Sequence, residues 1–131
     1  MATGTAVTTA GMIEVCKLMT GVAADAFTYV ALGTGTGTPA AGDTTLTEIS
    51  TNGGERVVAD THEYQATNKA VWIKAFTFSG SLGINECGVF NAAASGDMLV
   101  RHVFPATINV VNTDTLTLTI TCTLTDTTAR G

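Results

Sequence analysis

A chain of 131 residues, 45% of them hydrophobic, is long enough to bury the core of one domain and too short for two. Its six basic residues are scattered over a chain of net charge −5, which argues against nucleic-acid binding through phosphate contacts and favours a neutral or basic partner. No apolar run is long enough to span a membrane, and three cysteines without a CxxC spacing argue against a disulfide framework or a zinc site.

Two further features of the composition bear on location and assembly. Only 13% of the residues are charged, so we expect a partner to cover part of the surface. The first residues lack the basic start and the long apolar run of a signal peptide. We therefore expect a protein that is made in the cytoplasm and stays there until it is assembled or released, with its cysteines buried and reduced.

The beginning of the chain predicts an arm followed by a helix. Residues 1–10 are small and rich in threonine, which predicts a flexible N-terminal arm, with ordering by a neighbouring subunit as the alternative. Residues 11–22 place apolar side chains at spacings of three and four, which predicts a helix with Thr9 as its cap and Gly21 as its end. The apolar face of so short a helix must lie against the sheet or against another subunit. Residues 11–131, which include this helix, are expected to form a single β-rich domain.

The rest of the chain shows strand signals separated by turns. The predicted strands cover residues 26–32, 55–66, 70–79, 84–90, 98–104, 107–111 and 114–126. The last of these is the clearest, because its apolar residues alternate strictly with threonine. Asn68 predicts a hairpin between its two flanking strands, and Pro105 predicts the end of the strand before it. Six or seven strands, one helix and no βαβ alternation indicate a mainly β fold, an antiparallel sandwich or barrel-like domain.

No stretch matches a chemical motif closely enough to predict an active site. The glycines of residues 33–37 follow a strand as a phosphate-binding loop would, but no helix opens at the last glycine, so we expect a flexible loop. His62-Glu63 lacks the second histidine of an HExxH site. Arg101-His102 has no nucleophile or orienting partner, and we interpret it as a surface or interface contact. We therefore predict no enzyme, no cofactor, and no catalytic, cofactor-binding or metal-ligating residues.

Glu86 is the carboxylate for which the sequence leaves open whether the side chain is buried or faces solvent. It interrupts the apolar strand predicted over residues 84–90. A buried glutamate requires a cationic partner, for which Arg56 and Arg101 are the candidates. An outward-facing position at a sheet edge is the alternative.

Three stretches share their order and spacing with a known group of proteins. They are YVALGTG at residues 29–35, DTTLTE at 43–48 with Arg56 after it, and INECGVFN at 84–91 running into GDMLVR at 96–101. Together they resemble small structural proteins of tailed phages, over about residues 12–125. The group includes head decoration (cement) proteins and tail-fibre or baseplate modules.

The resemblance implies a non-catalytic homo-oligomer, with trimers at the local three-fold axes of an icosahedral shell as one arrangement. A single domain without a coiled coil, a collagen-like repeat or a receptor domain favours the capsid over the tail. We therefore expect a capsid decoration protein in the virion that binds the major capsid protein from outside and stabilises the head, without nucleic acid or membrane as partner. A tail-fibre or baseplate module is the first alternative. A carbohydrate-binding module with Trp72 or Tyr64 as a stacking platform is the second.

Overall fold

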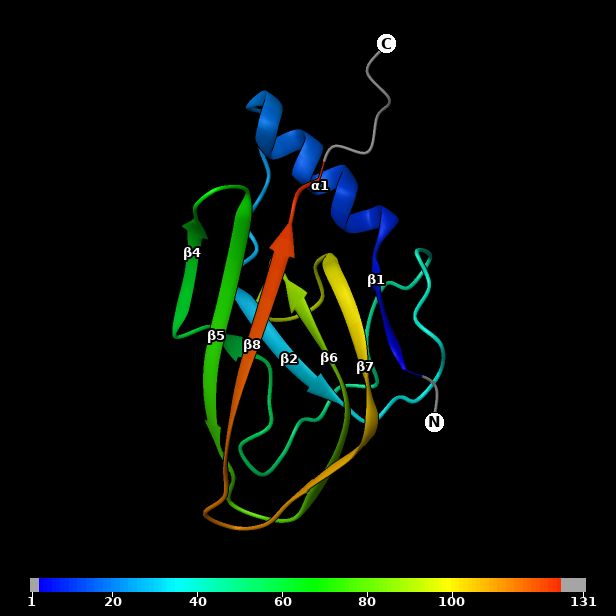
Figure 1. Cartoon of the computed structure of the whole chain (residues 1–131), viewed down its shortest axis with the longest axis vertical. Helices are drawn as coiled ribbons and strands as arrows, with labels where there is room; N and C mark the ends of the chain where they lie inside the picture. The colour runs from blue at the N-terminus through cyan, green and yellow to red at the C-terminus, as the bar shows by residue number, and fades with distance from the viewer. Residues whose placement is uncertain (1–2, 126–131) are drawn as a thin grey trace.

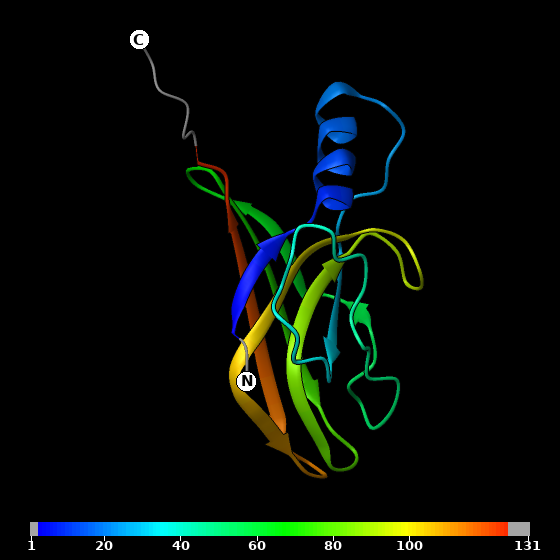
Figure 2. The same ribbon diagram turned by 90° about the vertical axis from the view of Figure 1, so that its right-hand side faces the viewer.

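Two antiparallel sheets lie face to face in the computed structural model, which describes residues 3–125, and a single helix stands at one end of them (Figures 1 and 2). The predicted mainly β sandwich with one short helix is confirmed, with eight strands in the described residues. In chain order the elements are β1 (Gly4–Val7), α1 (Thr9–Thr20), β2 (Tyr29–Gly33), β3 (Val57–Val58), β4 (Thr61–Gln65), β5 (Lys69–Thr77), β6 (Leu82–Phe90), β7 (Met98–Val110) and β8 (Thr115–Thr123).

The sheets have the strand orders β1-β7-β6-β2-β3 and β4-β5-β8. The chain passes from one sheet to the other three times. It does so between β3 and β4 and, at the end away from the helix, between β5 and β6 and between β7 and β8 (Figure 1). The hairpin predicted at Asn68 is confirmed as β4–β5, with Gln65 opposite Lys69. The helix, the entry to β2 and the ends of β4, β5 and β8 lie at the other end of the sandwich (Figure 1).

The expected flexible arm over residues 1–10 is corrected for residues 4–10, which belong to the domain. Residues 4–7 form β1, which pairs with β7 from Gly4 opposite Val103 to Val7 opposite Val100. The edge of β7 satisfies the backbone of this segment, so order does not depend on large side chains. Residues 1 and 2 lie outside the described part of the chain, as do 126–131, which include the last residue of the strand predicted over 114–126.

The helix is bounded by local chemistry at both ends. Its cap is Thr8, one residue before the predicted Thr9; the Thr8 hydroxyl accepts from Gly11 N at 2.9 Å and donates to the Met98 carbonyl. Gly21 ends the helix as predicted, in the left-handed conformation with φ 76°. The capping residue is itself fully buried, which ties the start of the helix to β7.

The prediction that Pro105 ends a strand is wrong. β7 continues through it to Val110. The register between β6 and β7 shifts just there, with Glu86 opposite Val103 but Ile84 opposite Ile108. β1 covers β7 only as far as Val103. Proline is tolerated because it lies in an irregular stretch where no neighbouring strand requires its missing N–H.

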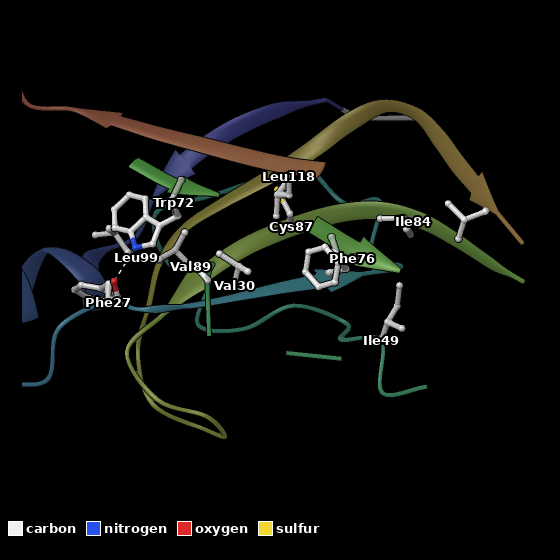
Figure 3. Close-up of a cluster of buried hydrophobic side chains, with 14 of the residues drawn as sticks. Phe27, Val30, Ile49, Trp72, Phe76, Ile84, Cys87, Val89, Leu99 and Leu118 are labelled. Carbon is white, nitrogen blue, oxygen red and sulfur yellow. Dashed lines mark hydrogen bonds between the residues drawn. The ribbon is translucent and has the colours of Figure 1, made fainter. Parts of the chain in front are cut away.

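The larger of two clusters of buried apolar side chains lies between the sheets, and β8 contributes to it as the alternation predicted. Its threonines are exposed, and Leu118, between them, is buried. Figure 3 shows Trp72 of β5 pointing into this core, where its Nε1–H donates to the Phe27 carbonyl at 2.6 Å. That bond joins the two sheets close to the helix end, because Phe27 precedes β2 and β5 belongs to the other sheet.

Candidate functional site

A buried ion pair holds the long segment between β2 and β3. Glu86 is 0% exposed, and its Oε1 accepts from Arg101 Nε at 2.7 Å. Its Oε2 accepts from the backbone N–H groups of Gly35 at 2.8 Å and Thr47 at 2.9 Å. Of the positions considered for Glu86, the structure thus shows the buried one, with Arg101 and not Arg56 as the partner.

Arg101 also reaches a second carboxylate in the same segment. Its Nη1 donates to Asp43 Oδ2 at 3.0 Å, and that oxygen accepts from Ala40 N at 2.9 Å. Burial alone would lower the pKa of the Arg101 guanidinium, but its hydrogen bonds to Glu86 and Asp43 outweigh this effect and raise the pKa. Arg101 therefore stays charged as a structural brace, which corrects its interpretation as a surface contact.

Gly33 and Gly35, the first two glycines of residues 33–37, pack against a carboxylate of their own chain. A Cβ placed on Gly33 or on Gly35 would lie 2.5 Å from Oε2 of Glu86. Glycine is needed at these two positions because the Glu86 side chain occupies the space that a Cβ would fill. This contact gives the phosphate-loop-like pattern a structural explanation.

Arg56 forms a second set of hydrogen bonds that joins separate segments of the chain. Its Nε and Nη2 donate to the two carboxylate oxygens of Glu48, at 2.9 and 2.6 Å. Its Nη1 donates to the carbonyls of Ala92 and Ser95 in the β6–β7 turn, at 3.0 and 2.7 Å. The guanidinium carbon lies 3.6 Å from the centre of the Phe90 ring. Arg56 and Glu48, like Arg101 and Glu86, therefore hold loops in place.

An apolar groove of about 850 Å³ lies at the helix end of the sandwich. We call it the helix groove. It lies between α1, the entry to β2, and the ends of β4, β5 and β8, which surround the helix end in Figures 1 and 2. Its lining includes Met12, Cys16, Phe27, Tyr64, Trp72 and Leu124.

The helix leaves much of its apolar surface uncovered. α1 packs on β7 at Gly11, where a Cβ would lie 2.5 Å from Leu99 Cα. Val15 packs against the core, whereas Met12 and Ile13 are about half exposed and Met19 is 76% exposed. One side of the helix therefore lies against β7, as one of the two interpretations of its apolar face expected, whereas Met12, Ile13 and Met19 stay largely exposed.

The remaining predicted positions lie apart from one another. His62 and Glu63 are exposed at the rim of the helix groove. His102 Nδ1 lies 2.6 Å from the Thr5 hydroxyl, on the opposite side of β7 from Arg101. Among residues 3–125 no group of three or more His, Cys, Asp or Glu side chains could hold a metal ion.

Trp72 is excluded as a carbohydrate-stacking platform, since it is buried and bonded to the Phe27 carbonyl. Tyr64 is 73% exposed and lies in the wall of the helix groove.

The three cysteines differ in exposure. Cys87 is buried, Cys122 is partly exposed and Cys16 is exposed, so the expectation of three buried thiols is corrected for Cys16. Burial raises the pKa of Cys122 and, together with the nearby Glu86 charge, raises that of Cys87 to about 12.

The helix groove was not predicted from the sequence. The one available signal was the run of large apolar side chains on a helix too short to be stable alone, Met12 and Met19 among them. Which of these side chains stay exposed depends on how the helix sits on β7.

α1 has neither the length nor the continuous apolar run needed to cross a bilayer, and it is the only helix among residues 3–125. A scan against models of known protein families finds no match to this chain, and a search of curated proteins finds none either.

Proposed function

We propose that this chain is a non-enzymatic structural protein of a tailed-phage virion, a decoration protein that binds the outside of the head through its helix groove and stabilises the shell. The observation that carries the proposal is the exposed apolar surface of the helix end, where Met12, Tyr64 and Leu124 line a groove of about 850 Å³. Apolar surface of this kind on a chain with little charge is typical of a surface covered by a partner.

Two further observations support this assignment. The polar residues that give the phage-like stretches their character are used within the chain, since Glu86 pairs with Arg101 and Glu48 with Arg56. A rigidly braced sandwich with an apolar end suits a subunit that must keep its shape in an assembly. The placement on the head and the major capsid protein as partner come from the resemblance.

The direct test is binding of the purified chain to preformed, expanded capsids of its own phage. We expect binding to the outer surface, and Met12→Gln to weaken it roughly tenfold by placing an amide in an apolar contact. Met19→Gln is the matched control, because Met19 lies on the same helix, is exposed, and does not line the helix groove.

Cryo-EM of the virion separates the head from the tail. Density repeated regularly over the icosahedral shell supports decoration, whereas density confined to the tail or its tip would replace this proposal with the tail-fibre or baseplate module. Equal capsid binding by the two methionine variants would show that the helix groove is not part of the interface.

A further inference from the structure

β8 is a long sheet edge without protection against pairing. It ends the β4-β5-β8 sheet, and among residues 3–125 no strand pairs with its outer side. Its nine residues contain no charge, no proline and no glycine. Its pairing with β5 runs without a register shift from Thr115 opposite Thr77 to Thr123 opposite Lys69. Exposed edges of soluble proteins normally carry at least one of these protections.

The other sheet edges differ from β8. β1 has four residues and β3 has two, so neither offers a long ladder. β4 has five residues with Glu63 at its centre, so a two-fold pairing of β4 would place this carboxylate opposite its own copy. In a chain of net charge −5, β8 is the long edge that can meet its own copy without opposing like charges.

The hydrogen-bonding pattern of β8 leaves the backbone N–H and C=O groups of its threonines facing the open edge of the sheet. The Phe78 N–H donates to the Asp114 carbonyl at 2.9 Å, and the Leu124 N–H donates to the Asn68 carbonyl at 3.0 Å. These bonds at the two ends of the strand set the even-numbered residues toward β5. Because such bonds alternate along an antiparallel strand, the N–H and C=O groups of the five odd-numbered threonines face the open edge. The residues concerned are Thr115, Thr117, Thr119, Thr121 and Thr123.

The sequence of β8 is self-complementary about its centre. With a two-fold axis at Thr119, an antiparallel copy places threonine opposite threonine at every odd position. Leu118 then faces Ile120 on the core side, and Leu116 faces Cys122. Pairs of threonines and pairs of aliphatic side chains are favourable cross-strand neighbours, and this register leaves no charge opposed to another.

From the open edge, the outward bonding phase and the self-complementary register, we infer that β8 pairs with β8 of a second copy of this chain, antiparallel about Thr119. The two three-stranded sheets then become one sheet of the order β4-β5-β8-β8-β5-β4. The contact is two-fold and isologous, and it does not depend on the location of the protein in a virion.

Sedimentation of the full chain under reducing conditions, over a series of concentrations, tests the pairing. We expect a dimer that Thr119→Lys and Thr119→Glu each weaken roughly tenfold or more, because each places two like charges face to face on the axis. An equimolar mixture of the two variants should restore a dimer. Thr77→Lys is the matched control, since Thr77 is an exposed threonine of the inner strand β5 and should leave the dimer unchanged.

Amide hydrogen exchange on the unmodified chain gives a readout that needs no variant. In the dimer the amides of Thr117, Thr119 and Thr121 should be protected, and dilution should expose them while those of Leu118 and Ile120 stay protected by β5. A chain that is monomeric at every concentration overturns the inference. A dimer whose threonine amides exchange freely overturns it as well, and would assign self-association to another surface such as the helix groove.

Discussion

The Glu86 carboxylate and the Arg101 guanidinium meet at 2.7 Å beneath the segment between β2 and β3, each almost without exposure to solvent. The pair joins β6 to β7, and through Gly35 and Thr47 it holds the segment that leads from β2 toward β3. Removal of Glu86 leaves Arg101 with Asp43 as its carboxylate partner, but takes the acceptor from Arg101 Nε and from the N–H groups of Gly35 and Thr47. Breaking a buried pair in this way costs about 3–5 kcal/mol of stability. We therefore expect Glu86→Ala to lower the free energy of unfolding by about that amount, measured by urea denaturation.

Glu55→Gln is the control for that experiment. Glu55 is exposed and forms no ion pair among residues 3–125, so its substitution should change stability by less than about 0.5 kcal/mol. Equal midpoints for the two variants would show that the buried pair contributes nothing to stability.

Arg56→Lys should loosen the β6–β7 turn although the charge is kept. Lysine cannot bind both oxygens of Glu48 while it also donates to the carbonyls of Ala92 and Ser95. We expect a loss of about 1–3 kcal/mol in unfolding free energy and faster amide exchange at Asn91, whose N–H donates to the Asp97 carbonyl across the turn. Lys17→Arg, at a pair within the helix whose lysine side chain is 43% exposed, should leave both measurements unchanged.

Gly11→Ala should destabilise the protein, although alanine is the better helix former by about 1 kcal/mol. The added methyl group would lie 2.5 Å from Leu99 Cα and 2.8 Å from the Met98 carbonyl oxygen, and backbone cannot move aside as a flexible side chain can. Overpacking of this kind costs about 1–3 kcal/mol, measured as a lower midpoint in urea. Gly42→Ala is the matched control, because nothing lies within 4 Å of its added Cβ; a midpoint raised by Gly11→Ala would contradict the tight contact of helix and β7.

Stability should fall in alkaline solution because of Cys87. Burial, with a smaller contribution from the Glu86 charge, raises the pKa of this thiol from 9.0 to about 12 in the folded chain. The unfolded chain therefore loses the thiol proton first, so the stabilisation is complete below pH 9 and is lost as pH rises toward 12. The slope from this group approaches about 1.4 kcal/mol per pH unit.

Urea denaturation of the unmodified chain and of Cys87→Ala, at several values between pH 8 and pH 11 under reducing conditions, isolates this effect. The stability difference between the two proteins should shrink as pH rises. Two curves that remain parallel would show that Cys87 ionises equally in the folded and unfolded chains.

Several features of this protein were determined by local sequence. The alternation of threonine with apolar residues produces β8 because successive side chains of a strand face opposite sides. Asn68 lies in the turn of the β4–β5 hairpin, and Gly21 ends the helix because its conformation has a positive φ. In each case the signal and its structural effect lie within a few residues of each other.

Tertiary structure decided the features that join distant parts of the chain. The sequence could not choose between Arg56 and Arg101 as the partner of Glu86, because the choice depends on the register between β6 and β7. β1 is ordered by the edge of β7, roughly a hundred residues away, and Pro105 is tolerated because that register is irregular beside it. The helix groove likewise exists only because Gly11 fixes the helix against Leu99 and leaves Met12 facing outward. Pairing partners, register and the covering of apolar faces are properties of the packed chain, and no short stretch of sequence encodes them.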